Sequence, residues 1–75
     1  MNAADRPNYQ PLQLSTRERE VLRCFADGLR RREVARALWI APDTVAFHAT
    51  NVRAKLGART LAQAVAVACR EGVLT

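Results

Sequence analysis

Apolar residues recur every three or four positions along most of the chain, which is the spacing of amphipathic helices. The first such run, 21–29, follows the sequence S-T-R-E, in which Ser15 and Glu18 are spaced to cap a helix start reciprocally. Gly28 tolerates the left-handed conformation that ends many helices. The pattern therefore predicts a first helix over about 16–27.

The same reasoning predicts three further helices. A short helix is expected at about 31–38, and another at about 42–56, which begins at a proline, a residue suited to the first helical position. Thr60 and Gln63 have the spacing of a second capping box, which opens a fourth helix over about 61–71. No segment alternates with the period of a strand, so the sequence predicts an all-α fold.

The chain of 75 residues has room for one small domain. Residues 1–13 carry two prolines and few apolar residues, which predicts a flexible N-terminal tail before a single domain at 14–75. A domain this small is marginally stable, so association with a partner would help it. No apolar run is long enough to span a bilayer and no leader is recognisable, so we expect a cytoplasmic protein.

Three residues join the second and third predicted helices, a spacing typical of a helix-turn-helix. Ala35 is small where the two helices would cross, Val45 would pack opposite it, and Ile40 would fill the turn. An ordinary helical hairpin would show the same pattern, so the spacing alone leaves both open.

The distribution of charge favours the helix-turn-helix. The net charge is +5, and residues 30–59 hold seven basic and two acidic side chains, while the rest of the chain is balanced. A localised basic block is typical of proteins that bind polyanions. A membrane surface would require a basic face opposite a broad apolar one, so we expect no membrane partner.

Few residues could support catalysis or bind a metal. Cys24 and Cys69 fit no metal-binding spacing, and His48 is the only histidine. We expect no enzyme activity, no metal and no cofactor. With no second domain to hold a pocket, we expect no small-molecule ligand either.

The stretches LSTREREVLRCFADGL, EVARAL and DTVAFHATNVRAKLGARTLAQAVAVA together resemble the LuxR-type (FixJ/NarL-type) DNA-binding domain of bacterial transcription regulators. The resemblance covers about residues 14–74. It implies a four-helix domain whose third helix enters the major groove of double-stranded DNA and whose fourth supports a homodimer. The chain resembles the small stand-alone members, unless it is a fragment of a longer regulator.

Three positions depart from the pattern of that family. Arg30 and Ala41 stand where Ser or Thr commonly caps the second and third helices, and an uncapped start costs about 1 kcal/mol. Trp39 occupies a turn position often held by Gly. We expect the fold to tolerate the bulk of Trp39 at this position.

On a helical wheel of the third helix, one face gathers the core residues Val45, Ala49, Val52 and Leu56. The resemblance places the base-reading positions on the other side, at Ala46, Phe47 and Thr50. These side chains cannot make the bidentate contacts that Arg makes with guanine, but they can touch thymine methyl groups. We expect modest base discrimination, to which DNA shape contributes.

Contacts to phosphates are expected to supply most of the affinity. The residues expected to make them are Arg30, Arg31, Arg32, Thr44, His48, Asn51, Arg53 and Lys55. A packed ring at the core edge is an equal alternative for His48, and a solvated charge is one for Lys55.

The fourth helix is apolar on almost every side, and one small domain cannot bury all of it. A leftover apolar strip marks an interface. The residues expected in a dimer interface are Leu61, Ala64, Val65, Val67 and Ala68.

The sequence thus predicts a DNA-binding transcription regulator. The alternative is a protein-interaction module of the same fold, in which exposed Phe47 binds RNA polymerase or another regulator without reading DNA. The weak base-reading residues favour the module, whereas the basic block favours DNA.

Overall fold

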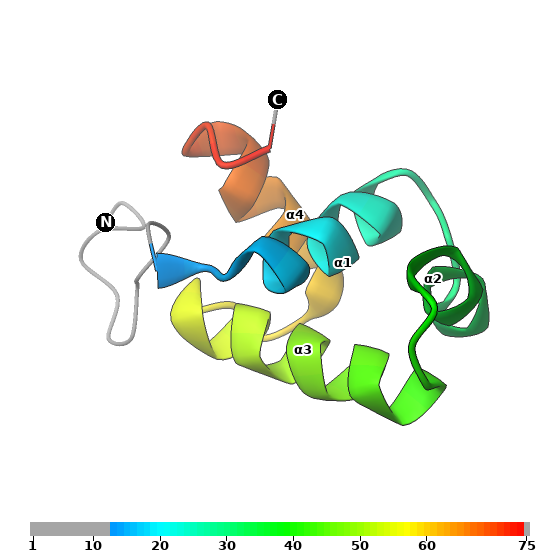
Figure 1. The fold of residues 1–75 in the computed structure, drawn as a ribbon. Coiled ribbons are helices and arrows are strands. Elements are labelled where there is room, and N and C mark those ends of the chain that lie inside the picture. The colour runs from blue at the N-terminus through cyan, green and yellow to red at the C-terminus, as the bar shows by residue number, and fades with distance from the viewer. Residues whose placement is uncertain (1–12, 75) are drawn as a thin grey trace.

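The computed structural model describes residues 13–74, so nearly all of the predicted N-terminal tail lies outside the described residues. Within them the chain forms four helices and no strand, which confirms the all-α class. The helices are α1 (Thr16–Ala26), α2 (Arg31–Leu38), α3 (Pro42–Lys55) and α4 (Leu61–Arg70) (Figure 1).

The helix starts follow local side-chain chemistry. At α1 the predicted capping box is present, because Glu18 N–H donates to Ser15 Oγ at 3.0 Å and Ser15 N–H donates to Glu18 Oε1 at 2.8 Å. The predicted box at α4 is only half formed. Gln63 N–H donates to Thr60 Oγ1 at 3.0 Å, but Gln63 Oε1 accepts from Arg59 N–H at 2.7 Å instead of from Thr60.

Three helices end one residue before the predicted position. The last expected residue of each leaves helical geometry, with ψ of 2° at Asp27, 1° at Leu56 and 3° at Glu71. Gly28 follows α1 with a φ of 92°, which its missing side chain permits. The glycines thus lie just beyond the helix ends, as predicted. Each helix is one residue shorter than expected because the residue before the glycine is a non-helical C-cap.

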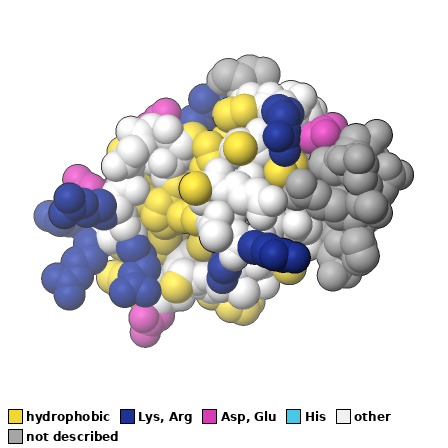
Figure 2. All heavy atoms as spheres, turned by 180° about the vertical axis from the view of Figure 1, so that it is seen from behind, with side chains coloured by type: hydrophobic (Ala, Val, Ile, Leu, Met, Phe, Trp, Pro, Cys, Tyr) yellow, Lys and Arg dark blue, Asp and Glu magenta, His cyan; other side chains and the backbone are white. Residues whose placement is uncertain are grey.

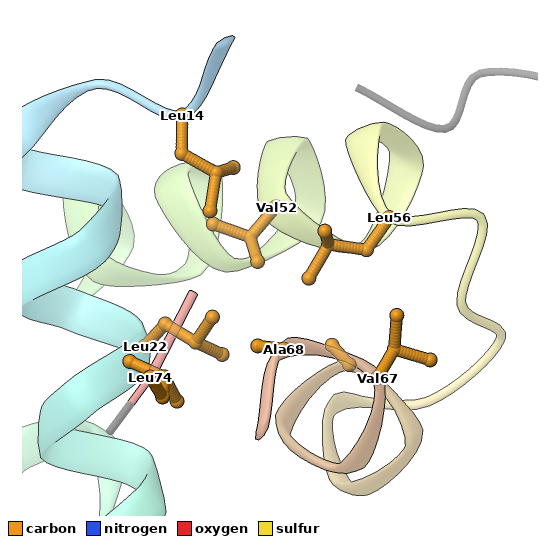
Figure 3. Packing of buried hydrophobic residues seen from close by; sticks show 8 residues of the cluster. Leu14, Leu22, Val52, Leu56, Val67, Ala68 and Leu74 are labelled. Atoms are coloured by element: carbon orange, nitrogen blue, oxygen red, sulfur yellow. The ribbon is translucent and has the colours of Figure 1, made fainter. Parts of the chain in front are cut away.

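The core consists of two clusters of buried side chains, and α1 and α3 contribute to both. Leu22 of α1 packs with Val52 and Leu56 of α3 against α4, as Figure 3 shows. Toward the other end, Val21 of α1 and Val45 of α3 pack against α2. The two longest helices thus join the halves of the domain, and α3 is fixed in place by contacts along its whole buried side.

The helices α2 and α3 form the predicted helix-turn-helix. Ala35 is 4% exposed and lies in one cluster with Val45, while Ile40 of the turn packs against that cluster. Figure 1 shows α2 lying across the start of α3. The small side chain of Ala35 lets the two helices approach closely, and the packing leaves the opposite side of α3 free.

Candidate nucleic-acid interface

The outward face of α3 is the one that the helical wheel predicts. Val45, Val52 and Leu56 are fully buried, whereas Phe47 is 64% exposed. Asp43, Thr50 and Ala54 share the exposed side. The Phe47 ring meets the edge of the His48 ring, with centroids 5.8 Å apart. Most of this phenyl ring is therefore available to a binding partner.

A hollow of about 320 Å³ lies beside this face. It is lined by Phe25, Arg31, Ala46, Ala49, Thr50, Arg53 and Leu61. The fold thus brings together two predicted base-reading residues, Ala46 and Thr50, and two predicted phosphate-binding residues, Arg31 and Arg53. They come from α2 and α3, which the helix-turn-helix holds at a fixed angle.

The guanidinium group of Arg53 is oriented by two contacts. Its Nη1 donates to the carbonyl oxygen of Arg59 at 3.3 Å, and its Nη2 donates to Thr50 Oγ1 at 3.5 Å. A guanidinium has five N–H donors, so others remain for a phosphate oxygen. This arrangement directs a positive charge along the exposed side of α3 near the predicted base-reading residues.

A second hollow, of about 660 Å³, surrounds the start of α2. Its lining consists of Arg30, Arg31, Arg32, Glu33 and Arg36. Between residues 13 and 74, none of these four guanidinium groups has a hydrogen-bond or ion-pair partner. Figure 2 shows Lys and Arg side chains gathered at one end of the molecule. Arg36 was not among the predicted binding residues, although its spacing of four from Arg32 places both on one helix face.

Lys55 makes a contact that the sequence did not predict. Its Nζ donates to Glu18 Oε1 at 2.8 Å and to the carbonyl oxygen of Gln13 at 3.0 Å. The Glu18 side chain is 7% exposed and that of Lys55 is 29% exposed. Burial alone would raise the pKa of Glu18, but the hydrogen bonds from Lys55 and Ser15 outweigh it, so the pKa lies below its ordinary value. Lys55 thus forms a structural ion pair, and its contact with a phosphate stays a prediction.

The remaining predicted phosphate-binding residues, Thr44, His48 and Asn51, are all half-buried on α3. Neither α2 nor α3 has a side-chain acceptor at its N-cap, as the sequence predicted for Arg30 and Ala41. Instead, Glu33 Oε1 accepts from Arg30 N–H at 2.8 Å. The first-turn N–H groups of α2 are therefore left without a capping side chain and can donate to a phosphate. In α3 only the N–H of Asp43 is available, because Pro42 has none and Thr44 N–H donates to the carbonyl oxygen of Ala41 at 3.0 Å.

The predicted dimer interface on α4 requires correction. Ala64, Val67 and Ala68 are fully buried in the core against α1 and α3, so they are not available to a partner. Leu61 and Val65 are half-buried and pack against the same cluster. The exposed apolar positions of α4 are Ala62, Ala66 and Cys69. Together with Val65 these residues have helical spacing, and we name them the α4 strip.

Other kinds of site find little support in the described part of the chain. Residues 13–74 contain no group of His, Cys, Asp and Glu side chains that could hold a metal ion. None of the helices there is long and apolar enough to cross a membrane. Burial raises the pKa of the Cys24 thiol, and the carboxylates of Asp27 and Glu20 raise it further, so the thiol stays protonated at neutral pH.

Comparison with known proteins gives consistent matches. A family described as bacterial regulatory proteins, luxR family, matches residues 12–68. An HTH-type transcriptional regulator of Mycobacterium bovis is 41% identical over 59 residues, which are 79% of this chain and 7% of that protein. The transcriptional regulatory protein FixJ of Azorhizobium caulinodans is 42% identical over 60 residues, which are 80% of this chain and 28% of that protein.

A solved structure has the same fold. Full-length FixJ from B. japonicum superposes with a TM-score of 0.74 at 35% identity, covering 87% of this chain and 32% of that one. The chain thus spans less than a third of the length of each of these proteins.

Proposed function

The chain belongs to the luxR family of bacterial regulatory proteins, and from this premise we propose that it is a DNA-binding transcription regulator whose α3 enters the major groove. One observation carries the proposal. The exposed ring of Phe47 lies beside a hollow that Ala46 and Thr50 line together with Arg31 and Arg53. Apolar side chains for the bases and cations for the phosphates are the two components that such an interface needs.

In this proposal, Phe47, Ala46 and Thr50 meet the floor of the groove. The phenyl ring and the alanine methyl group contact thymine methyl groups, and the Thr50 hydroxyl makes a hydrogen bond to a base edge. Arg31 and Arg53 hold the phosphates on either side, and Arg30 adds positive charge. Because the base contacts are largely apolar, phosphates supply most of the affinity and the preference among bases is modest.

We also propose that two copies pair through the α4 strip, since its small side chains allow two helices to approach closely. The strip is built from Ala62, Val65, Ala66 and Cys69. On the face shown in Figure 2, hydrophobic side chains reach the surface beside the basic end. A homodimer would present its two α3 helices to half-sites about one DNA turn apart, roughly 10 base pairs. A protein that regulates transcription in a bacterium acts in the cytoplasm, where we place this one.

Selection of bound sequences from a random pool of duplex DNA tests the proposal. We expect enrichment of a thymine-containing motif, repeated with two-fold symmetry at a spacing of about one DNA turn. The protein with Phe47→Ala should enrich a weaker motif from the same pool. If neither protein enriches a sequence and neither retains DNA at low salt, the result favours the alternative function. In that alternative the domain is a protein-interaction module, and Phe47 binds RNA polymerase or another regulator.

A further inference from the structure

The turn between α2 and α3 exposes a large side chain that the fold does not require. Trp39 is 94% exposed. Its backbone has φ 59° and ψ 42°, and it is the one non-glycine residue with positive φ in the range 13–74. Bulky residues rarely adopt this conformation, whereas glycine adopts it without strain. Neither packing nor backbone geometry therefore explains an indole at this position.

Unpaired positive charge lies next to this turn. Ile40 and Pro42 line a hollow of about 460 Å³ together with Arg32, Ala35 and Arg36. The guanidinium groups of Arg32 and Arg36 have no partner among the described residues. Trp39 does not line this hollow but directly precedes Ile40 in the turn. We call Arg32, Arg36, Trp39, Ile40 and Pro42 the turn surface.

The acidic residues nearby form no ion pair with the turn surface. Neither Glu33 nor Asp43 lines its hollow, and Glu33, which lines the neighbouring hollow with Arg32 and Arg36, accepts from Arg30 N–H. On the α1 side of the turn, Arg17 Nη1 donates to the carbonyl oxygen of Leu38 at 3.4 Å, but this cation is already paired with Glu20 at 3.5 Å. A partner for this surface must therefore supply negative charge as well as an apolar group.

We propose that the turn surface docks an acidic segment of a partner protein, which presents a hydrophobic side chain to Trp39 and carboxylates to Arg36 and Arg32. Trp and Arg are the residues that contribute most to binding at protein interfaces. A guanidinium pairs with a carboxylate through two parallel hydrogen bonds. DNA phosphates would pair with the arginines but would make no apolar contact with the indole, Ile40 and Pro42. An acidic protein segment with a hydrophobic side chain therefore fits the surface better.

This surface adjoins the proposed DNA-reading face, because Arg31 lines a hollow with Arg32 and Arg36, but the two surfaces have different linings. The DNA-reading hollow is lined by Arg31, Ala46, Thr50 and Arg53, whereas Trp39, Arg36 and Pro42 do not line it. A regulator with both surfaces can hold DNA through α3 while the turn between α2 and α3 contacts a second protein.

Trp39 itself provides the readout, because the chain contains a single tryptophan. The probe is a short synthetic helical peptide with glutamates and leucines on one face, and the control is the same peptide with lysine in place of glutamate. We expect the acidic peptide to shift the Trp39 emission to the blue in a saturable manner, and the lysine peptide to cause no shift. Arg36→Ala should weaken peptide binding about tenfold, as expected for one charge-assisted pair.

An unchanged emission with the acidic peptide would overturn the proposal, as would an equal shift with the lysine peptide or full affinity in Arg36→Ala. A DNA titration covers the other class of partner. Saturating duplex DNA should leave the Trp39 emission unchanged, and Trp39→Gly should keep wild-type DNA affinity, measured by the anisotropy of a labelled duplex. If DNA shifts the emission and Trp39→Gly loses DNA affinity, the turn surface is a DNA contact and the proposal fails.

Trp39→Gly also separates a lost contact from a lost fold. Glycine suits a φ of 59°, so this variant should melt no lower than the wild type. It should nevertheless lose the acidic peptide, measured by calorimetry. Retention of peptide binding in this folded variant would contradict the proposal.

Discussion

Phe47 is 64% exposed in the free domain, so most of its phenyl ring can be buried only by a binding partner. Apolar surface that leaves water contributes about 25 cal/mol per Å². We therefore expect Phe47→Ala to leave the melting temperature unchanged and to weaken binding to the selected DNA site by about 1–3 kcal/mol, the usual range for one base position. Binding to unrelated DNA should barely change. Titration of labelled duplexes, with thermal melts of both proteins, measures this.

Two outcomes would contradict this account of Phe47. If the variant melts at a much lower temperature, the ring is part of the core and not of an interface. If DNA affinity stays the same while a bound protein is lost, the ring contacts a protein and not a base. The matched control is Trp39→Gly, which also removes an exposed aromatic ring but lies outside α3.

Glu18 is a residue whose importance lies in the fold. It accepts hydrogen bonds from both Ser15 N–H and Lys55 Nζ at 2.8 Å. Glu18→Gln should lower the free energy of unfolding by about 1–3 kcal/mol, because the pair is mostly but not completely buried. The matched control is Glu20→Gln, whose pairing with Arg17 is solvent-exposed and should matter by less than about 0.5 kcal/mol. Equal effects in urea unfolding would contradict the structural role.

The pH dependence of stability follows from the same carboxylate. Its pKa is lowered in the folded state, so ionised Glu18 stabilises the protein above the pKa of the unfolded chain. This contribution is lost as the pH falls through the folded-state pKa. Wild-type stability should therefore fall more steeply on acidification than that of Glu18→Gln. Parallel stability curves for the two proteins between neutral and acidic pH would show that the pair contributes nothing.

The ion pair also shows which residue roles a sequence leaves open. The spacing of Ser15 and Glu18 predicted the capping box, because capping depends on residues three apart. Lys55 lies 37 residues from Glu18, and only the packing of α1 on α3 brings them together. A solvated Lys55, a phosphate contact and this ion pair were equally compatible with the local sequence.

At the scale of the helix, the sequence predicted the buried side of α3 correctly but not that of α4. Apolar residues also stand on the exposed side of α3, but its large aliphatic side chains Val45, Val52 and Leu56 fall on one side, and that side is buried. In α4, alanines stand on both the buried and the exposed side, so residue type alone did not identify the side that faces the core. That is why Ala64, Val67 and Ala68 were assigned to an interface although they are buried.

Two substitutions on adjacent residues of α4 test the corrected assignment. Ala66→Glu places a charge on the exposed strip, so the protein should stay helical but lose pairing on DNA, measured by sedimentation of the complex. Val67→Glu places the charge in the core, where an unpaired carboxylate is costly, so this variant should unfold. A folded Val67→Glu, or unchanged pairing in Ala66→Glu, would contradict the assignment.

For the whole molecule, the sequence predicted the family and the four-helix fold, and the family match and the FixJ structure confirm both. The sequence shows where the basic block lies along the chain, because each residue type fixes the charge at its position. It does not show the division of this block into two hollows, because that depends on the angle at which α2 crosses α3. The fold places Arg53 at one hollow and Arg36 at the other, whereas Arg31 lines both.

The salt dependence of DNA binding tests the central proposal most directly, because each phosphate contact releases counterions from the duplex. The measurement is the anisotropy of a labelled duplex at several salt concentrations, for the wild type and for Arg31→Ala, Arg53→Ala and Arg70→Ala. Affinity should fall steeply with salt, and the slope of log affinity against log salt should shrink by about one for Arg31→Ala and for Arg53→Ala. The slope should stay the same for Arg70→Ala, which removes an exposed charge from the last turn of α4. No DNA binding at low salt, or equal slopes for all four proteins, would contradict the account.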